Sequence, residues 1–235
     1  AFSCPFHGWT FSNDGRLSNV PGFKEIYLEK LDIEAHGLVP VAKIASYKGL
    51  LFATFDNNAP TLEDYLGDMA WYLDSWFDRT EGGTEAVGGV HKWVIDCNWK
   101  FAAEQFASDL YHAAVSHASA VMAMAPPGFD ASRQGFERES VQFSSVNGHG
   151  AGWLLGATPH VWFEKELVRW LFDSLPEAER RLGGARATRF TGHNLVFPNF
   201  AFLNGGPMRV FHPRGPNRIE VWGWAVVDKA APPDA

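Results

Sequence analysis

The chain has 235 residues, 46% of them hydrophobic and 14% aromatic, with a formal net charge of -7. This length and composition allow a sizeable core and are typical of a globular protein rather than a disordered one. The acidic balance, without clustered Lys and Arg, excludes a nucleic-acid-binding surface. No apolar run reaches the roughly 18 residues of a spanning helix, and the N-terminus lacks a signal-peptide pattern. We therefore expect a cytoplasmic protein that does not enter a membrane.

The first 55 residues predict a small β unit. Asn13-Asp14-Gly15 is a strong hairpin signal, and the apolar run at 48–55 predicts a buried strand. The run Asn57-Asn58-Ala59-Pro60 then predicts a boundary. We accordingly expect two domains, one over residues 1–55 and one over 56–235.

The second part of the chain mixes helical and strand patterns. A capping pattern predicts a helix over 61–77, and the spacing of apolar residues predicts another over 98–120. Aromatic and β-branched residues between turns predict antiparallel strands within 137–163 and 186–228, with a helix near 164–182 between them. The predicted fold class is α+β, with an antiparallel sheet around helices.

A carboxylate and two histidines lie close together at Asp109, His112 and His117. Two imidazoles and a carboxylate form the usual ligand set of non-haem Fe(II) enzymes. On an ideal helix the two histidines diverge by about 140°, so they can share one metal only if the helix is distorted between them. Asp109 could be the third ligand, or it could accept the N–H of His112 and orient its ring. Ordinary surface histidines on a helix remain an alternative for the trio.

The N-terminal motif Cys4-Pro5-Phe6-His7 offers one thiolate and one imidazole. A Rieske [2Fe–2S] centre needs two of each, although the motif alone could also be half of a zinc site. Gly8 and Trp9 favour the cluster, since a tight turn and a shielding indole suit it. Cys97 has no histidine at cluster spacing and is predicted to be a packing residue, and a disulfide between the two cysteines is not expected in a reducing compartment.

Three further residues are predicted to line a cavity next to the metal. Gln105 and Phe106 precede Asp109 by about one helical turn, and Ala113 follows His112. Packing in the core is an equally good interpretation of these residues. Zinc-dependent hydrolysis is disfavoured, because no glutamate accompanies the histidines as a general base, as in His-Glu-x-x-His.

Taken in chain order, these motifs resemble the large (α) subunit of bacterial Rieske non-haem iron dioxygenases that hydroxylate aromatic rings. The pattern is most similar to the biphenyl, toluene and polycyclic-arene branch. The resemblance covers nearly the whole chain and rests on the motif at residues 4–9, Asn98-Trp99-Lys100, the run from Glu104 to His117, the strand at 197–203, His212-Pro213-Arg214-Gly215-Pro216 and Glu220-Val221-Trp222.

The resemblance implies that residues 1–55 are the C-terminal part of a Rieske domain and that 56–235 form a helix-grip (START-like) catalytic domain. The implied reaction adds both atoms of O₂ to an aromatic hydrocarbon and gives a cis-dihydrodiol. Electrons would come from NADH through a reductase or ferredoxin. A small β subunit and an α3β3 or α3 assembly are also implied. A Rieske monooxygenase or demethylase is the nearest alternative, and a non-catalytic relative that binds hydrophobic ligands is another.

The resemblance also assigns roles by position. Cys4 and His7 match the second pair of [2Fe–2S] ligands, and His112 and His117 match the two histidines that bind the mononuclear iron. Asp109 matches a bridging aspartate, which links His112 to a Rieske histidine of the neighbouring subunit and so carries electrons between subunits.

Two ligand groups of the family fall outside these 235 residues. The first Cys-x-His pair of the cluster would precede residue 1, and the third iron ligand, an aspartate, would follow residue 235. We therefore expect an internal segment of a longer protein, truncated before the end of its catalytic domain, which by itself neither holds the cluster nor turns over. Four residues separate His112 from His117, where some biphenyl-type relatives have five, so the preferred arene stays open.

Overall fold

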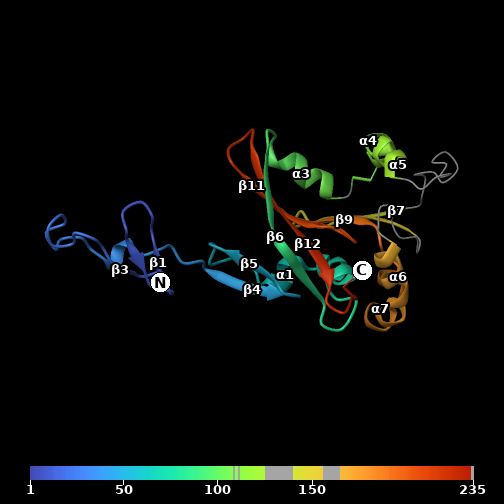
Figure 1. Cartoon of the computed structure of the whole chain (residues 1–235), viewed down its shortest axis with the longest axis horizontal. Helices are drawn as coiled ribbons and strands as arrows, with labels where there is room; N and C mark the ends of the chain where they lie inside the picture. Colours follow the sequence, from blue (N-terminus) through green and yellow to red (C-terminus); the bar gives the residue numbers. More distant parts are fainter. Residues whose placement is uncertain (108, 111, 125–139, 156–164, 234–235) are drawn as a thin grey trace. The chain divides into compact units, whose positions relative to one another are not determined.

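The computed structural model of the chain describes residues 1–107, 109–110, 112–124, 140–155 and 165–233. The chain divides into two compact units, Ala1–Leu62 and Glu63–Ala235, each with its own sheet (Figure 1). Within the described ranges, no helix is both long and apolar enough to cross a membrane.

The first unit begins with a small antiparallel sheet of three strands, β1 (Phe2–Ser3), β2 (Thr10–Phe11) and β3 (Leu17–Asn19). The turn between β2 and β3 contains Gly15, whose φ of 87° suits a glycine. The hairpin predicted from Asn13-Asp14-Gly15 is therefore confirmed. A short 3-10 helix, Glu34–His36, follows later in the unit.

Two more strands of the first unit, β4 (Lys43–Tyr47) and β5 (Leu50–Thr54), pair as a separate antiparallel hairpin. A strand was expected here, but its predicted burial is wrong. Leu51 is 74% exposed and Phe55 is 71% exposed. Two strands cover little of each other's side chains, because each face of a hairpin needs a further layer to become a core.

The second unit is built on a seven-stranded antiparallel sheet, which agrees with the predicted mixed fold with a large antiparallel sheet. The sequence patterns did not predict the edge strand β6, in which Gly88 and Gly89 interrupt the alternation of side chains. In spatial order the strands are β6 (Thr84–Ile95), β12 (Ile219–Asp228), β11 (Met208–Pro213), β10 (Phe200–Leu203), β9 (Gly192–Val196), β8 (Gly150–Leu154) and β7 (Ser140–Ser144).

The helices are shorter than the sequence patterns predict. The helix expected over 61–77 is interrupted at Gly67, whose φ is 47°, and the helix expected near 164–182 is interrupted at Ser174. Parts of the predicted 137–163 strands lie outside the described residues. The helices are α1 (Leu62–Leu66), α2 (Met69–Phe77), α3 (Trp99–Phe106), α4 (Ala113–Ser116), α5 (Ala118–Met124), α6 (Lys165–Asp173), α7 (Leu175–Leu182) and α8 (Gly184–Ala187).

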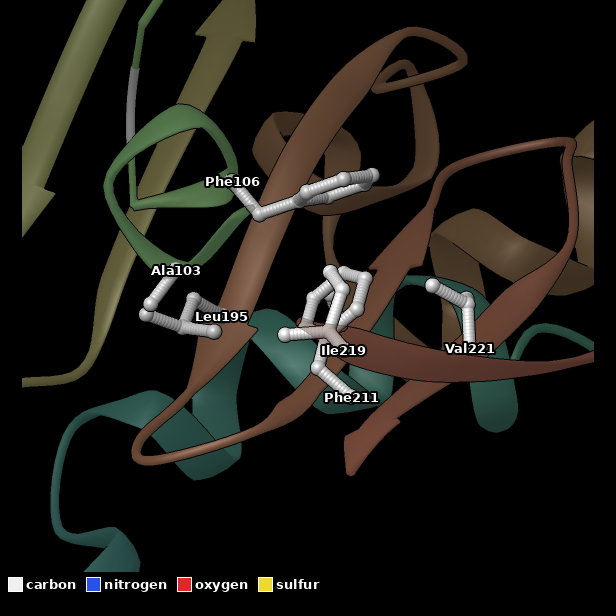
Figure 2. Packing of buried hydrophobic residues seen from close by; sticks show 7 residues of the cluster. Ala103, Phe106, Leu195, Phe211, Ile219 and Val221 are labelled. Carbon is white, nitrogen blue, oxygen red and sulfur yellow. The ribbon is translucent and has the colours of Figure 1, made fainter. Parts of the chain in front are cut away.

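Helix α3 packs on one face of the sheet through a compact apolar cluster. Figure 2 shows the side chain of Phe106 reaching from α3 toward the strand residues. Cys97 packs against this cluster, so its predicted role in packing is confirmed. Seven buried residues form the cluster: Ala103, Phe106, Leu195, Ala201, Phe211, Ile219 and Val221.

The opposite face of the sheet packs against α2. Phe202 contacts Phe77 of α2, with ring centroids 5.1 Å apart, while its neighbour Ala201 belongs to the cluster beneath α3. Asn194 is fully buried on the α2 face and accepts a hydrogen bond from the Trp153 indole at 3.0 Å. Successive residues of a strand thus face different helices, as the two-residue period of a strand requires.

A buried histidine ties α1 to the turn between β9 and β10. His149 is 1% exposed, and its Nδ1 accepts the backbone N–H of Phe197 at 3.0 Å. Its Nε2 therefore carries the proton and donates to the backbone oxygen of Tyr65 at 2.8 Å. The Tyr65 hydroxyl donates in turn to the Phe197 oxygen at 2.8 Å. Burial lowers the pKa of His149, although its hydrogen bond to Tyr65 partly opposes this effect.

Stability should fall as the pH drops below about 6.5, the pKa of an unfolded histidine. The unfolded chain then binds a proton at His149, whereas folded His149, with its lowered pKa, stays neutral. His149→Gln supplies similar hydrogen bonds without titrating. We expect the free energy of unfolding of this variant to depend less on pH between about pH 7 and pH 5, by up to about 1.4 kcal/mol per pH unit. Urea unfolding measures this, with His91→Gln, at an exposed site on β6, as the control. Equal slopes for wild type and His149→Gln would contradict the expectation.

Candidate metal centre

The candidate site follows α3, and a single side chain fixes where that helix begins. The Oδ1 atom of Asn98 accepts the backbone N–H of Lys100 at 3.0 Å and so caps the helix. The Nδ2 atom of Asn98 donates to the backbone oxygen of Pro216 at 2.7 Å. This second bond fastens the start of α3 to the turn between β11 and β12. The predicted helix start at Asn98 is confirmed.

The helical segment is broken where the two candidate ligands lie. Helix α3 ends at Phe106, and His117 falls between α4 and α5. The expectation of one helix through about residue 120 is therefore wrong, whereas the predicted distortion between His112 and His117 is confirmed. After His112, the N–H groups of Val115 and Ser116 both bond to its backbone oxygen, at 3.0 and 2.7 Å.

The break brings the two imidazoles together. The Nε2 atoms of His112 and His117 lie 3.0 Å apart, and the ring centroids lie 4.8 Å apart. On the other side of the His112 ring, Nδ1 lies 3.1 Å from the Oδ2 atom of Asp109. That contact is close enough for an ion pair but is not aligned as a hydrogen bond. His112 thus has a carboxylate at one ring nitrogen and a second imidazole at the other.

A third histidine, His193 on β9, also approaches the site. Its ring centroid lies 5.8 Å from that of His112 and 5.6 Å from that of Phe106. The sequence motifs did not identify His193, because it lies far along the chain and carries no motif of its own. The position of His193 in the strand could have indicated that it faces the site. His193 lies two residues before the core residue Leu195 and therefore on the same face of β9.

Burial disfavours the charged form of two of these rings, those of His193 and His117. Burial lowers the pKa of His193 to about 4, and the charge that His112 would carry lowers it further. Burial also lowers the pKa of His117, with a smaller contribution from His112. Neutral imidazole is the form that binds a metal ion, so at neutral pH His117 and His193 have the protonation state that a metal site needs.

The predicted pocket residues lie in different surroundings. Gln105 is half-buried near the end of α3, and its backbone hydrogen-bonds His193. Phe106 is only 2% exposed and belongs to the core cluster. Ala113 begins α4, but its side chain lies outside the described part of the chain, as does Tyr111 of the motif.

The candidate cluster ligands lie in the first unit, on a tight turn. The N–H of Gly8 bonds to the Cys4 oxygen at 2.9 Å, and the N–H of Cys4 bonds to the Trp9 oxygen at 2.8 Å. The φ of 75° at Gly8 suits a glycine. Cys4 is partly buried and His7 is exposed. This turn puts both candidate ligands on one short loop.

Neither unit contains a complete ligand set within the described residues. In those ranges, no group of three or more His, Cys, Asp or Glu side chains could hold a metal ion. The pair at His112 and His117, with Asp109 at the back of one ring, is the arrangement that the described residues provide.

Comparisons with known proteins identify the family to which this chain belongs. A family model described as the catalytic domain of the ring-hydroxylating alpha subunit matches residues 62–235. The chain is 44% identical to the biphenyl dioxygenase subunit alpha of Paraburkholderia xenovorans (strain LB400), over 99% of its own length. It is 42% identical to the benzene 1,2-dioxygenase subunit alpha of Pseudomonas putida, over 100% of its length. The chain therefore belongs to the ring-hydroxylating alpha-subunit family.

Solved structures agree with this assignment. A naphthalene 1,2-dioxygenase with indole bound in its active site superimposes with a TM-score of 0.85 at 35% identity, over 99% of this chain. The chain spans about half the length of the relatives that it matches, 54% in each of these cases.

The role of Asn98 in placing α3 can be tested by its stability effect. Asn98→Ala removes both the cap and the bond to Pro216, and we expect the free energy of unfolding to fall by about 1–2 kcal/mol. Asn98→Ser keeps a capping oxygen but loses the bond to Pro216, so it should recover part of the loss. Urea denaturation provides the measurement. A change below about 0.5 kcal/mol for Asn98→Ala, as for an ordinary surface substitution, would show that neither bond positions the helix.

Proposed function

We propose that the chain is the catalytic part of an aromatic-ring dioxygenase, in which His112 and His117 bind a mononuclear Fe(II). The observation that carries this proposal is the meeting of the two Nε2 atoms, 3.0 Å apart, across a broken helical segment. Two imidazoles that point at one another suit one shared cation, since a neutral ring with its proton on Nδ1 presents the lone pair of Nε2 to the ion.

Asp109 is proposed to orient His112 rather than to bind the metal. Its carboxylate contacts Nδ1, the nitrogen that faces away from His117. Metal-binding histidines commonly direct their other ring nitrogen at a carboxylate, which fixes the tautomer and raises the basicity of the ligand. The same position suits the proposed bridge, by which electrons reach His112 from a Rieske histidine of a neighbouring subunit.

His193 is proposed to keep the site free of additional positive charge. Its low pKa, about 4 because of burial, leaves its ring neutral beside His112. Gln105, Phe106 and Ala113 remain the proposed lining of the substrate pocket. Bound Fe(II) would supply the activation of O₂, while these residues would hold an apolar ring beside it and exclude water.

The complete protein is proposed to convert an aromatic hydrocarbon to a cis-dihydrodiol, consistent with the relatives named for biphenyl, benzene and naphthalene. Cys4 and His7 are proposed as half of the ligands of a Rieske [2Fe–2S] cluster at the tight turn of residues 4–9, within a Rieske domain over 1–55. The catalytic domain would cover 56–235. Electrons from NADH would arrive through a reductase or ferredoxin, and a small β subunit would complete an α3β3 or α3 assembly.

Metal binding can be tested on the complete protein by anaerobic titration with Fe(II) or Co(II). We expect His112→Ala to abolish binding, because it removes one of the two proposed ligands. Asp109→Ala should keep the metal but weaken its binding by about 10–100-fold, as for other groups that orient a ligand. His91→Ala, at an exposed position on β6, is the control. Equal and complete loss of binding in the Asp109 and His112 variants would instead favour direct ligation by Asp109.

The reaction itself can be tested with the complete oxygenase, its reductant, an arene and ¹⁸O₂. We expect a diol in which both new oxygen atoms come from O₂. One labelled oxygen in the product would favour a monooxygenase. Absence of O₂ uptake with a metal-loaded protein would favour the alternative of a ligand-binding relative.

A further inference from the structure

An arginine lies on the face of the sheet that packs against α3. Arg209 on β11 pairs with Ala201 of β10 on one side and with Gly223 of β12 on the other. These small neighbours leave room for a long side chain. A methyl group at Gly223 would come within 3.2 Å of the Trp93 ring, so the indole covers that glycine.

The guanidinium of Arg209 interacts with two aromatic rings. Its central carbon lies 5.8 Å from the ring centroid of Trp93 on β6 and 5.6 Å from that of Phe106 on α3. Its Nε atom is buried and has no hydrogen-bond partner among the described residues. A planar guanidinium can stack on aromatic faces in a way that an ammonium cannot, and the attraction of the cation to the rings partly offsets its lost hydration.

From Phe106, ring contacts continue to the candidate metal ligands. The Phe106 ring lies 5.6 Å from His193, and His193 lies 5.8 Å from His112. Phe106 also contacts Phe211, with the ring centroids 5.7 Å apart. Because a close-packed interior transmits displacements, a shift of the Phe106 ring would change the position of His193 and then that of His112.

We propose that Arg209 is a positioning residue of the metal centre, which fixes His193 and through it the ring of His112 by its cation–π contact with Phe106. This inference rests on the proposed function, because His112 matters as a metal ligand. A methionine side chain would fill much of the same space as that of Arg209. If Arg209 were needed only for packing, Arg209→Met would therefore leave the histidine rings in place. The proposal instead requires the planar, charged group.

The experiment compares Arg209→Met and Arg209→Lys with Arg218→Met in the full chain. Arg218 lies at the start of β12, is largely exposed and pairs with Asp96, so its variant is a matched control. The ¹⁵N signals of the histidine rings are recorded without metal, and Co(II) is then titrated. We expect the ring signals of His193 and His112 to shift in both Arg209 variants and Co(II) binding to weaken by about tenfold. Arg218→Met should change neither.

Two further outcomes separate this inference from the proposed function. Failure of the complete wild-type protein, which would include the third iron ligand expected after residue 235, to bind Co(II) would contradict the proposed function, while the ring signals would still decide the role of Arg209. Unchanged ring signals in Arg209→Met, or full recovery in Arg209→Lys, would overturn the inference. If Arg209→Met does not fold, Trp93→Leu removes one of the two rings and should shift the same signals. Unchanged signals in that variant would equally overturn the inference.

Discussion

The candidate centre depends on one constraint, which is that two histidines five positions apart cannot reach a common ion from an unbroken helix. The chain meets this constraint by interrupting the helical segment at His117, which lies between α4 and α5. The break therefore allows the imidazoles of His112 and His117 to approach each other at their Nε2 atoms.

The sheet supplies the fixed frame for this irregular segment. Asn98 fastens the start of α3 to the β11–β12 turn, and Phe106 anchors its end in the core cluster. His193 on β9 then contacts the ring of His112, with the ring centroids 5.8 Å apart. Rigid elements hold a functional geometry more accurately than loops can, which explains how a short, broken helical segment can present a defined pair of ligands.

The sequence predicted those features that depend on local patterns. Aromatic and β-branched residues between turns predicted the strands after residue 186, and the spacing of apolar residues predicted the start of α3. Features that depend on tertiary contacts were missed. The apolar pattern over 61–77 continues through Gly67, so it did not predict the break there. In β6, Gly88 and Gly89 interrupt the alternation of side chains. His193 was missed for the same reason, since only the pairing of distant strands brings it to His112.

The most direct measurement is anomalous diffraction at the iron absorption edge from crystals of the iron-loaded protein. The account predicts an anomalous peak between the Nε2 atoms of His112 and His117, with the Asp109 carboxylate on the far side of the His112 ring. A peak at the Asp109 carboxylate itself, or at a position away from both histidines, would contradict it.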